Sequence, residues 1–265
     1  MKKIAIALLL FLSLIFGGCN TVRNSFRYKN SEKYSIGEGS VSLSEVKKIK
    51  VEWAGTLAYI TTYDGSEIHF YEELDEGTDE KYQLHYYHDN DTLYIEPCAS
   101  LLFPQFNFKT KVLHLEIPSS LTKDDLISFD LDLVSTNGEI RGINAKNIDI
   151  DSVSGNIVIS NIICDDFDAD SVSGGITIDT INSEVSSIDV LSGSISINNI
   201  NSRKVDIDAK SGNIDIYLAE SDSFDINYKT TSGEFINELG LTKNGDGIIK
   251  YDIETLSGNL TIHKK

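Results

Sequence analysis

A short phrase that returns at a nearly constant interval constrains this chain more than any other feature. Ile148-Asp-Ile-Asp-Ser-Val-Ser-Gly155-Asn-Ile-Val-Ile is followed by Phe167-Asp-Ala-Asp-Ser-Val-Ser-Gly174-Gly-Ile-Thr-Ile. The phrase also returns, more loosely at its first occurrence, around Gly138, Gly193, Gly212, Gly233 and Gly258. Subtracting successive glycine numbers gives spacings of 17, 19, 19, 19, 21 and 25 residues. A fixed period of this length is typical of a solenoid.

Within each repeat, apolar and polar side chains alternate around a Ser-Gly pair. The expected inward residues of two successive repeats are Ile148, Ile150, Val153, Ile157, Ile159 and Ile162, then Phe167, Ala169, Val172, Ile176, Ile178 and Ile181. A period of two indicates a strand on each side of a corner, and glycine accepts the positive φ that a corner can require. We therefore predict an all-β fold, a single-stranded parallel β-solenoid (β-helix) with coils of about 19 residues.

A flat antiparallel sandwich of hairpins is the alternative, because Ser-Gly can also close a hairpin. Hairpins have no reason to keep one phrase at a nearly constant spacing, so the solenoid is favoured. The last two spacings lengthen, and the chain closes on His263, Lys264 and Lys265. Since charges at an open sheet edge discourage edge-to-edge pairing, we expect these residues to lie at the open end of the stack.

The first 19 residues have the features of a lipoprotein signal peptide. Lys2 and Lys3 precede the apolar run Ile4 to Phe16, which at 13 residues is shorter than the roughly 20 that a membrane-spanning helix needs. Leu14-Ile-Phe-Gly-Gly-Cys19 resembles the cleavage box of bacterial lipoproteins, with Phe16 in place of the usual leucine. The resemblance implies that Cys19 becomes the lipidated N-terminus and anchors the protein outside the cytoplasm on the bacterial cell membrane. An ordinary secretory signal with a chance cysteine is the alternative.

The rest of the chain divides by composition into three parts. Residues 20–45 are polar and predict a tether, and residues 46–130 predict an irregular β-rich N-terminal part of the solenoid domain. Residues 131–265 hold the regular repeat coils. Two cysteines follow Cys19, namely Cys98 and Cys164; they could form a bridge, but we favour two buried thiols.

The chain is strongly acidic. Its formal net charge is −18, and removing residues 1–19 removes Lys2 and Lys3, so that 21 basic and 41 acidic residues leave −20. Such a chain repels nucleic acid and anionic lipid headgroups. We therefore expect no nucleic-acid partner and expect the lipid anchor to provide the contact with the membrane.

Acidic residues recur at two fixed distances from the glycine of each repeat. Six residues before it are Asp132, Asp149, Asp168, Asp206 and Asp252; four residues before it are Asp151, Asp170, Asp189, Asp208 and Glu254. Stacked coils would align them into columns, either as a solvated face that keeps the rod soluble or as a face for divalent cations or a basic ligand. The residues of this candidate face are Asp149, Asp151, Asp168, Asp170, Asp189, Asp206 and Asp208. The absence of a calcium-repeat glycine pattern weakens the metal version.

Nothing in the sequence points to a catalytic residue. The recurring serines have no recurring histidine beside them to serve as a base, and the acids are spread evenly without a localised cationic partner. We therefore expect no enzyme activity, no bound metal and no cofactor. Tyr82, Tyr86, Tyr87 and Tyr94, with Trp53, could stack on sugars, although packing explains them as well.

Several short motifs resemble the bacterial DUF4097-type putative adhesins, which are related to the GIN-domain adhesin-head proteins. These motifs are Ile49-Lys-Val-Glu-Trp53, Asp64-Gly65, Asp91-Thr-Leu-Tyr-Ile95 and Leu113-His-Leu-Glu-Ile-Pro118, followed by the Ser-Gly phrases. The resemblance implies a β-solenoid at the cell envelope and supplies no catalytic residues. We therefore expect a non-catalytic binding or adhesion scaffold whose partner is an envelope protein or a glycan. The alternatives are an accessory lipoprotein of an envelope-stress or transport system and a polysaccharide-acting β-helix enzyme.

Overall fold

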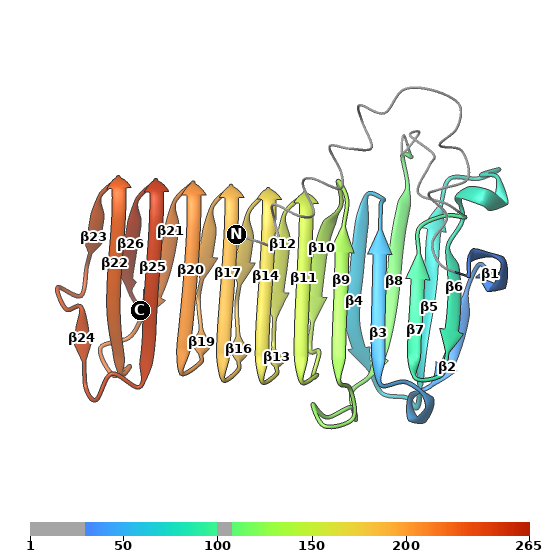
Figure 1. The fold of residues 1–265 in the computed structure, drawn as a ribbon, viewed down its shortest axis with the longest axis horizontal. Coiled ribbons are helices and arrows are strands. Elements are labelled where there is room, and N and C mark those ends of the chain that lie inside the picture. Colours follow the sequence, from blue (N-terminus) through green and yellow to red (C-terminus); the bar gives the residue numbers. More distant parts are fainter. Residues whose placement is uncertain (1–29, 100–107) are drawn as a thin grey trace.

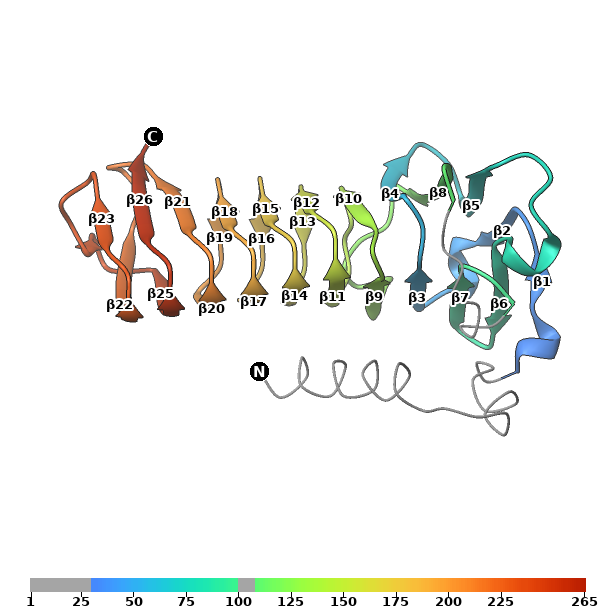
Figure 2. The ribbon, with the colours of Figure 1, turned by 90° about the horizontal axis from the view of Figure 1, so that it is seen from above.

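The computed structural model describes residues 30–99 and 108–265. The predicted signal peptide, including Cys19, lies outside the described residues. Two long sheets face each other along the molecule and enclose a continuous apolar core from Val46 to Ile262 (Figures 1 and 2). The predicted all-β solenoid is confirmed.

The first sheet consists, in spatial order, of β1 (Ser35–Ile36), β6 (His85–Asp89), β7 (Thr92–Glu96), β3 (Lys48–Trp53), β9 (Ser128–Leu133), β11 (Asn147–Ser154), β14 (Asp166–Ser173), β17 (Val185–Ser192), β20 (Lys204–Ser211), β25 (Ile249–Ser257), β22 (Phe224–Ser232) and β24 (Lys243–Asn244). The second sheet consists of β2 (Gly39–Ser42), β5 (Glu67–Leu74), β8 (Lys111–Pro118), β4 (Leu57–Tyr63), β10 (Asn137–Arg141), β12 (Ile157–Ser160), β15 (Ile176–Ile178), β18 (Ile195–Ile197), β21 (Ile214–Leu218), β26 (Leu260–Lys264) and β23 (Phe235–Asn237). A short third sheet holds β13 (Ile162–Ile163), β16 (Ile181–Asn182) and β19 (Ile200–Asn201). Short 3-10 turns occur at Ser31–Lys33, Leu43–Glu45 and Glu80–Tyr82.

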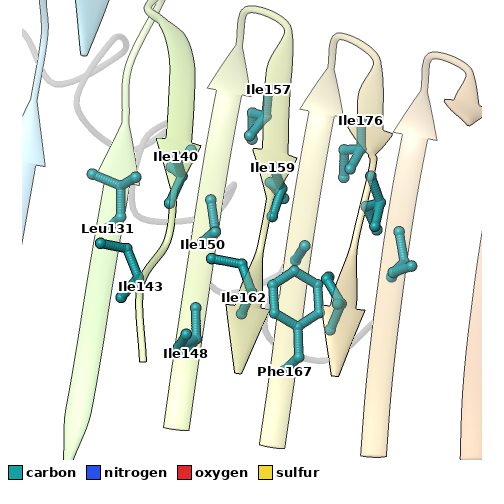
Figure 3. Packing of buried hydrophobic residues seen from close by; sticks show 14 of the residues in the cluster. Leu131, Ile140, Ile143, Ile148, Ile150, Ile157, Ile159, Ile162, Phe167 and Ile176 are labelled. Atoms are coloured by element: carbon teal, nitrogen blue, oxygen red, sulfur yellow. The ribbon is translucent and has the colours of Figure 1, made fainter. Parts of the chain in front are cut away.

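The regular coils stack in parallel at a constant offset of 19 residues. In the first sheet, Leu131 pairs with Ile150, which pairs with Ala169. In the second sheet, Ile140 pairs with Ile159. The side chains of the two sheets meet between them, as Figure 3 shows for Leu131, Ile150 and Ile159. Each coil alone buries few residues, so the core depends on contact between neighbouring coils.

The structure corrects the assignment of the first corner. Gly138 pairs with Ile157, so it lies two residues beyond the corner. Thr136 takes the corner position instead. Its carbonyl lies so close to Gly155, the corner glycine of the next coil, that a Cβ added to Gly155 would overlap it. The interval from Thr136 to Gly155 is again 19 residues (155 minus 136), which explains why counting from Gly138 gave 17.

The structure also corrects which residues face inward just before the corner. Ser152 and Ser171 are buried, whereas Val153 and Val172, the predicted inward residues, are only half-buried. The strand alternation that begins at Ile150 continues through the serine, so the valine side chain turns outward. The same position holds Leu133 in the preceding coil and Val190 and Ala209 in the following coils, all of them buried, so it faces inward whatever the size of the side chain.

The last two coils are exchanged in space relative to their order in the sequence. The terminal strands β25 and β26 lie between the Gly212 coil and the Gly233 coil (Figure 1). The Gly212 N–H donates to the Ser257 carbonyl, and the Gly258 N–H donates to the Ser232 carbonyl, each at 3.2 Å. His263, Lys264 and Lys265 therefore follow an internal coil, and the prediction that they mark the open end is wrong.

The N-terminal end has the same kind of exchange. Strand β3 lies between β7 and β9, and β4 lies between β8 and β10, so the first coil of the chain is internal. Antiparallel strands β5 and β6 pair with β8 and β7 on the outside. Residues 35–42, which we expected to belong to a tether, add β1 and β2 to this end as further antiparallel strands.

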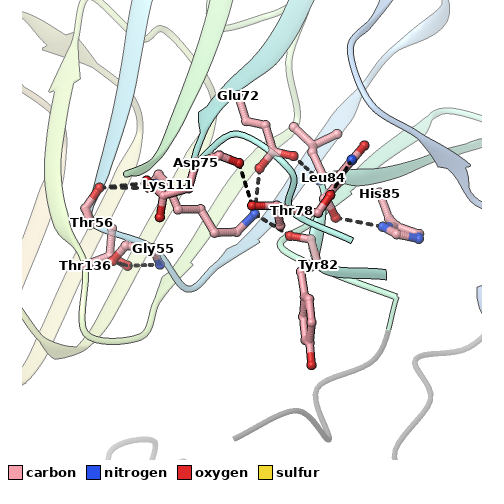
Figure 4. A network of polar contacts seen from close by, with 11 residues as sticks. Gly55, Thr56, Glu72, Asp75, Thr78, Tyr82, Leu84, His85, Lys111 and Thr136 are labelled. Carbon is pink, nitrogen blue, oxygen red and sulfur yellow. Dashed lines mark hydrogen bonds and ion pairs between the residues drawn. The ribbon is translucent and has the colours of Figure 1, made fainter. Parts of the chain in front are cut away.

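A buried ion pair supports the N-terminal part of the core (Figure 4). Lys111 is fully buried, and its Nζ donates to Glu72 Oε2 at 2.6 Å and to the Tyr82 carbonyl at 2.9 Å. The same ammonium lies 4.6 Å from the centre of the Trp53 ring, which is also fully buried. Burial lowers the pKa of Lys111, against the attraction of Glu72. The Trp53 side chain is thus part of the core and is not available to stack on a sugar.

The two remaining cysteines do not meet. Cys98 and Cys164 are both buried and do not form a disulfide, as favoured from the sequence. Burial raises the pKa of the Cys164 thiol to about 12, so this thiol is held in its protonated form.

We predict that Gly174→Ala destabilises the protein far more than Gly37→Ala. Both glycines have a positive φ, +144° and +91°, but a Cβ at residue 174 would overlap the Gly155 carbonyl, whereas one at residue 37 would meet nothing within 4 Å. The expected loss in free energy of unfolding is roughly 2–4 kcal/mol for Gly174→Ala and about 1 kcal/mol for Gly37→Ala. Urea titrations of both variants measure it, and equal losses would show that coil contact at the corner is not limiting.

Candidate functional site

Two columns of acidic side chains run along the outer side of the first sheet. Asp151 pairs with Asp170, Asp170 with Asp189, and Asp189 with Asp208. We call this row the Asp151 column; the strand register extends it to Glu52 and Asp132 at one end and to Glu254 at the other. The parallel row contains Asp130, Asp149, Asp168, Asp206 and Asp252 and is called the Asp149 column. The two columns together form the acidic face.

The register changes two details of the expected columns. Asp132 pairs with Asp151 and so belongs to the Asp151 column, while Asp130 takes the place beside Asp149. This follows from the corner at Thr136, since counting from Gly138 shifted Asp132 by two positions. Ser187 lies between Asp168 and Asp206, so the Asp149 column is interrupted. The Asp151 column has no such gap.

Lysine and asparagine side chains stand at the ends of the columns. Lys50 forms an ion pair of 3.0 Å with Asp130 at the N-terminal end. At the other end, Lys229 contacts Glu254 at 2.9 Å, and Asn227 donates to Asp252 at 2.8 Å. Lys204 also contacts Asp206 within the Asp149 column. The acidic side chains that repeat without interruption therefore lie in the Asp151 column, where a cationic partner would be attracted.

Crowding changes the protonation of the Asp151 column. Burial, followed by the charges of Asp168 and Asp189, raises the pKa of Asp170 to about 7. Desolvation and the charge of Asp189 also raise the pKa of Asp208. Desolvation by surrounding atoms and the charge of Asp151 raise the pKa of Asp132, although its side chain still reaches solvent. Parts of the column are thus only partly ionised at neutral pH.

A pocket of about 400 Å³ opens where the acidic face meets the N-terminal strands. It is lined by Asn30, Tyr34, Lys50, Glu52, Tyr87, Asp89, Tyr94, Glu96, Asp130, Leu131, Asp132, Asp149 and Asp151. Strands β3, β6, β7, β9 and β11 all contribute. The pocket joins two of the predicted face residues, Asp149 and Asp151, to a group of tyrosines and glutamates that the repeat does not contain.

Glu96 is the most buried acid of this pocket. The residue is 4% exposed, and its Oε2 atom has no hydrogen-bond partner among the described residues. Burial and the charge of Glu52 raise the pKa of Glu96 far above that of an ordinary glutamate. Glu52, which shares a hydrogen bond with Glu96, also has a raised pKa, mainly because of burial. The two carboxyl groups therefore share a proton near neutral pH.

Three tyrosines form one wall of the pocket. The rings of Tyr34 and Tyr87 lie 5.3 Å apart between centroids, and those of Tyr87 and Tyr94 lie 6.3 Å apart in a stacked arrangement. Lys33 Nζ lies 5.8 Å from the centre of the Tyr87 ring, on the same group of rings. Tyr87 and Tyr94 had two interpretations from sequence, and the structure places both beside acids in a pocket.

The recurring serines, the histidines and the possible metal ligands of the described residues do not form a second candidate site. Ser154, Ser173, Ser192 and Ser211 stack in one row at the corners, and the row continues to Ser257 and Ser232. His114 lies between the rings of Tyr59 and Tyr71, at 5.5 and 4.5 Å between centroids. Within residues 30–99 and 108–265, no three His, Cys, Asp or Glu side chains converge closely enough to hold a metal ion.

The sequence did not reveal Glu52, Glu96 or the tyrosine wall as a site. Glu52 and Glu96 each follow the alternation of their own strand, so each is recognisable as an outward residue. Their meeting depends on β7 pairing with β3, which are more than 40 residues apart and not related by the repeat. No spacing in the sequence signals that pairing.

The stacked parallel coils define a two-sheeted β-solenoid whose first sheet carries the acidic face on its outer side. Residues 46–265 match the model of the Toastrack DUF4097 family, and the chain belongs to that family. No curated protein matches the sequence. Within the described residues, no helix is long and apolar enough to span a membrane.

The chain is also similar to solved structures at low sequence identity. A putative adhesin from Bacteroides fragilis NCTC 9343 is 15% identical, with a TM-score of 0.52 over 87% of this chain and 97% of that one. A putative cell adhesion protein from Clostridium sporogenes ATCC 15579 is 14% identical, with a TM-score of 0.37 over 88% and 100%. A putative lipid binding protein from Parabacteroides distasonis ATCC 8503 is 16% identical, with a TM-score of 0.46 over 86% and 96%. Of these three, the Bacteroides fragilis structure supports the fold.

We predict that Glu96→Gln stabilises the protein at pH 8. A raised carboxyl pKa means that the folded protein binds more protons than the unfolded chain above about pH 4.5, so this group's contribution to stability is full below that pH and is lost as the pH rises. Glutamine keeps the shape without the proton, so it should gain roughly 1–3 kcal/mol at pH 8 and much less at pH 5. Thermal melts from pH 5 to 8 measure the difference, with the exposed Glu234→Gln as the matched control. A Glu96→Gln protein that melts below the wild type at pH 8 would contradict the buried neutral carboxyl.

Proposed function

We propose that this protein is a non-catalytic binding scaffold of the bacterial cell envelope, anchored outside the cytoplasm by lipid on Cys19. In this proposal the acidic face is the binding surface, and its partner is a basic region of an envelope protein. The face residues are the predicted Asp149, Asp151, Asp168, Asp170, Asp189, Asp206 and Asp208, joined by Asp130 and Asp132. The family and the similar structure of a putative adhesin from Bacteroides fragilis support a binding role.

The uninterrupted Asp151 column carries this proposal. Neighbouring carboxylates about 4.8 Å apart repel each other by roughly 1 kcal/mol even in water, so the column opposes folding. The fold does not need carboxylates in order to form a ladder, because asparagines stack at the corners. The Asn156 N–H donates to Asn137 Oδ1, and the Gly175 N–H donates to Asn156 Oδ1, each at 2.9 Å. A cationic partner gives the carboxylates a role that asparagine could not fill.

The lipid anchor rests on the sequence from Lys2 to Cys19. More than one acyl chain is needed for lasting attachment, and the modification implied by the lipoprotein box supplies it. We predict that radiolabelled palmitate is incorporated into the wild type in cells and that Cys19→Ser abolishes the label and releases the protein from the membrane fraction. A labelled Cys19→Ser protein, or an unlabelled wild type, would contradict anchoring at this residue.

A second test addresses the acidic face. The quadruple change of Asp151, Asp170, Asp189 and Asp208 to asparagine should reduce crosslinking to the main partner in intact cells at least tenfold, because a basic surface loses its counter-charges. The matched control changes four acids outside the two columns, Asp179, Glu184, Glu234 and Asp246, to their amides. Equal loss in both variants would indicate net charge instead of the face, and no loss in either would contradict the proposal.

The identity of the captured molecule separates the classes of function. A single integral membrane protein would indicate the accessory role in an envelope-stress or transport system. Capture of a glycan or of a host surface would indicate adhesion. Turnover of a polysaccharide by the purified protein would contradict a non-catalytic scaffold.

A further inference from the structure

We propose that the pocket formed by Glu52, Glu96 and the tyrosines Tyr34, Tyr87 and Tyr94 binds the primary ammonium group of a small organic cation. This deepens the proposed function by naming the ligand chemistry at the N-terminal end of the acidic face. It rests on the proposed function in one respect, because both proposals assume a positively charged ligand. The argument comes from one buried oxygen atom, one aromatic wall and one ion pair.

The buried oxygen is Glu96 Oε2. Glu96 lines the pocket, and its Oε2 atom is buried and receives no hydrogen bond from the described residues. A buried carboxyl oxygen without a donor is costly, and an incoming N–H group removes that cost. An alkylammonium group brings three N–H donors together with a positive charge.

The aromatic wall determines what kind of cation fits. Tyr34, Tyr87 and Tyr94 form a continuous row of rings, and each ring face attracts a cation while its edges and carbons pack against alkyl groups. A bare metal ion gains little from such a wall, whereas an ammonium group on a short carbon chain contacts both the acids and the rings. The volume of about 400 Å³ exceeds what one inorganic ion needs and accommodates a small organic molecule.

Lys50 shows that the pocket already accommodates this chemistry. Its ammonium lies 3.0 Å from Asp130, at the side of the pocket nearest to the Asp149 column. Among the described residues that line the pocket, Lys50 is the single basic one, and Lys33 lies beside the tyrosine wall at Tyr87. The acids that line the pocket are Glu52, Asp89, Glu96, Asp130, Asp132, Asp149 and Asp151. The pocket therefore remains net negative after this pair is counted, and a second ammonium is attracted electrostatically.

The test is a calorimetric titration of the purified protein at pH 8 with n-butylammonium, tetramethylammonium and n-butanol. We expect saturable millimolar binding of n-butylammonium, binding at least tenfold weaker for tetramethylammonium, which lacks N–H donors, and none for n-butanol, which lacks the charge. Equal binding of all three compounds, or saturable binding of none, would overturn the proposal.

Two variants locate the site. Glu96→Gln and Tyr94→Leu should each weaken n-butylammonium binding at least tenfold. Because Glu96→Gln is expected to stabilise the protein at pH 8, weaker binding by this variant would not result from unfolding. Asp246→Asn, which lies outside the acidic face and does not line the pocket, should bind as the wild type does. Unchanged binding by Glu96→Gln would overturn the assignment. Pocket variants that still crosslink to the partner in cells would show that the face functions without the pocket, so the two proposals can fail separately.

Discussion

The close approach of successive backbones at the corner is the contact on which the rest of the structure depends. A Cβ at Gly174, Gly193 or Gly212 would overlap the carbonyl group of the corner glycine one coil earlier. Because the main chains touch there, the coils are held at one spacing and one register. That register determines which side chains become neighbours on the outer surface. The core and the acidic face therefore both follow from the register that the corner contacts impose on the coils.

Because the register between coils is constant, side chains that repel one another are aligned as strictly as side chains that pack together. Inside the molecule this produces rows of isoleucine, leucine and alanine, whose burial stabilises the stack. Outside, it places Asp151, Asp170, Asp189 and Asp208 beside one another, where their charges repel. Asparagine at the corners shows that a stacked row can instead be linked by hydrogen bonds. This difference between the two rows is the basis of our proposal that the acids bind a partner outside the chain.

Both ends of the solenoid depart from the order of the sequence in the same way. The first coil, β3 and β4, and the last coil, β25 and β26, each lie inside the stack. Strands β7 and β8 pair on the outer side of the first coil, and β22 and β23 pair on the outer side of the last. Antiparallel strands β5 and β6 then cover one end, and β24 pairs with part of β22 at the other. At the N-terminal end this exchange brings Glu96 beside Glu52 and creates the pocket.

The sequence by itself determined the coil length, the parallel stacking, the solenoid class and the two acidic columns, because a repeated phrase imposes the same local geometry on every coil. It could not determine that Thr136 replaces glycine at the first corner, since the strand register is visible only once the neighbouring coil is in place. It also could not determine the exchange of the end coils or the meeting of Glu96, Glu52 and the tyrosines. Those features depend on which sheet edge a distant strand pairs with. That pairing is determined by the contacts along the whole strand in the folded protein, and no local sequence pattern encodes it.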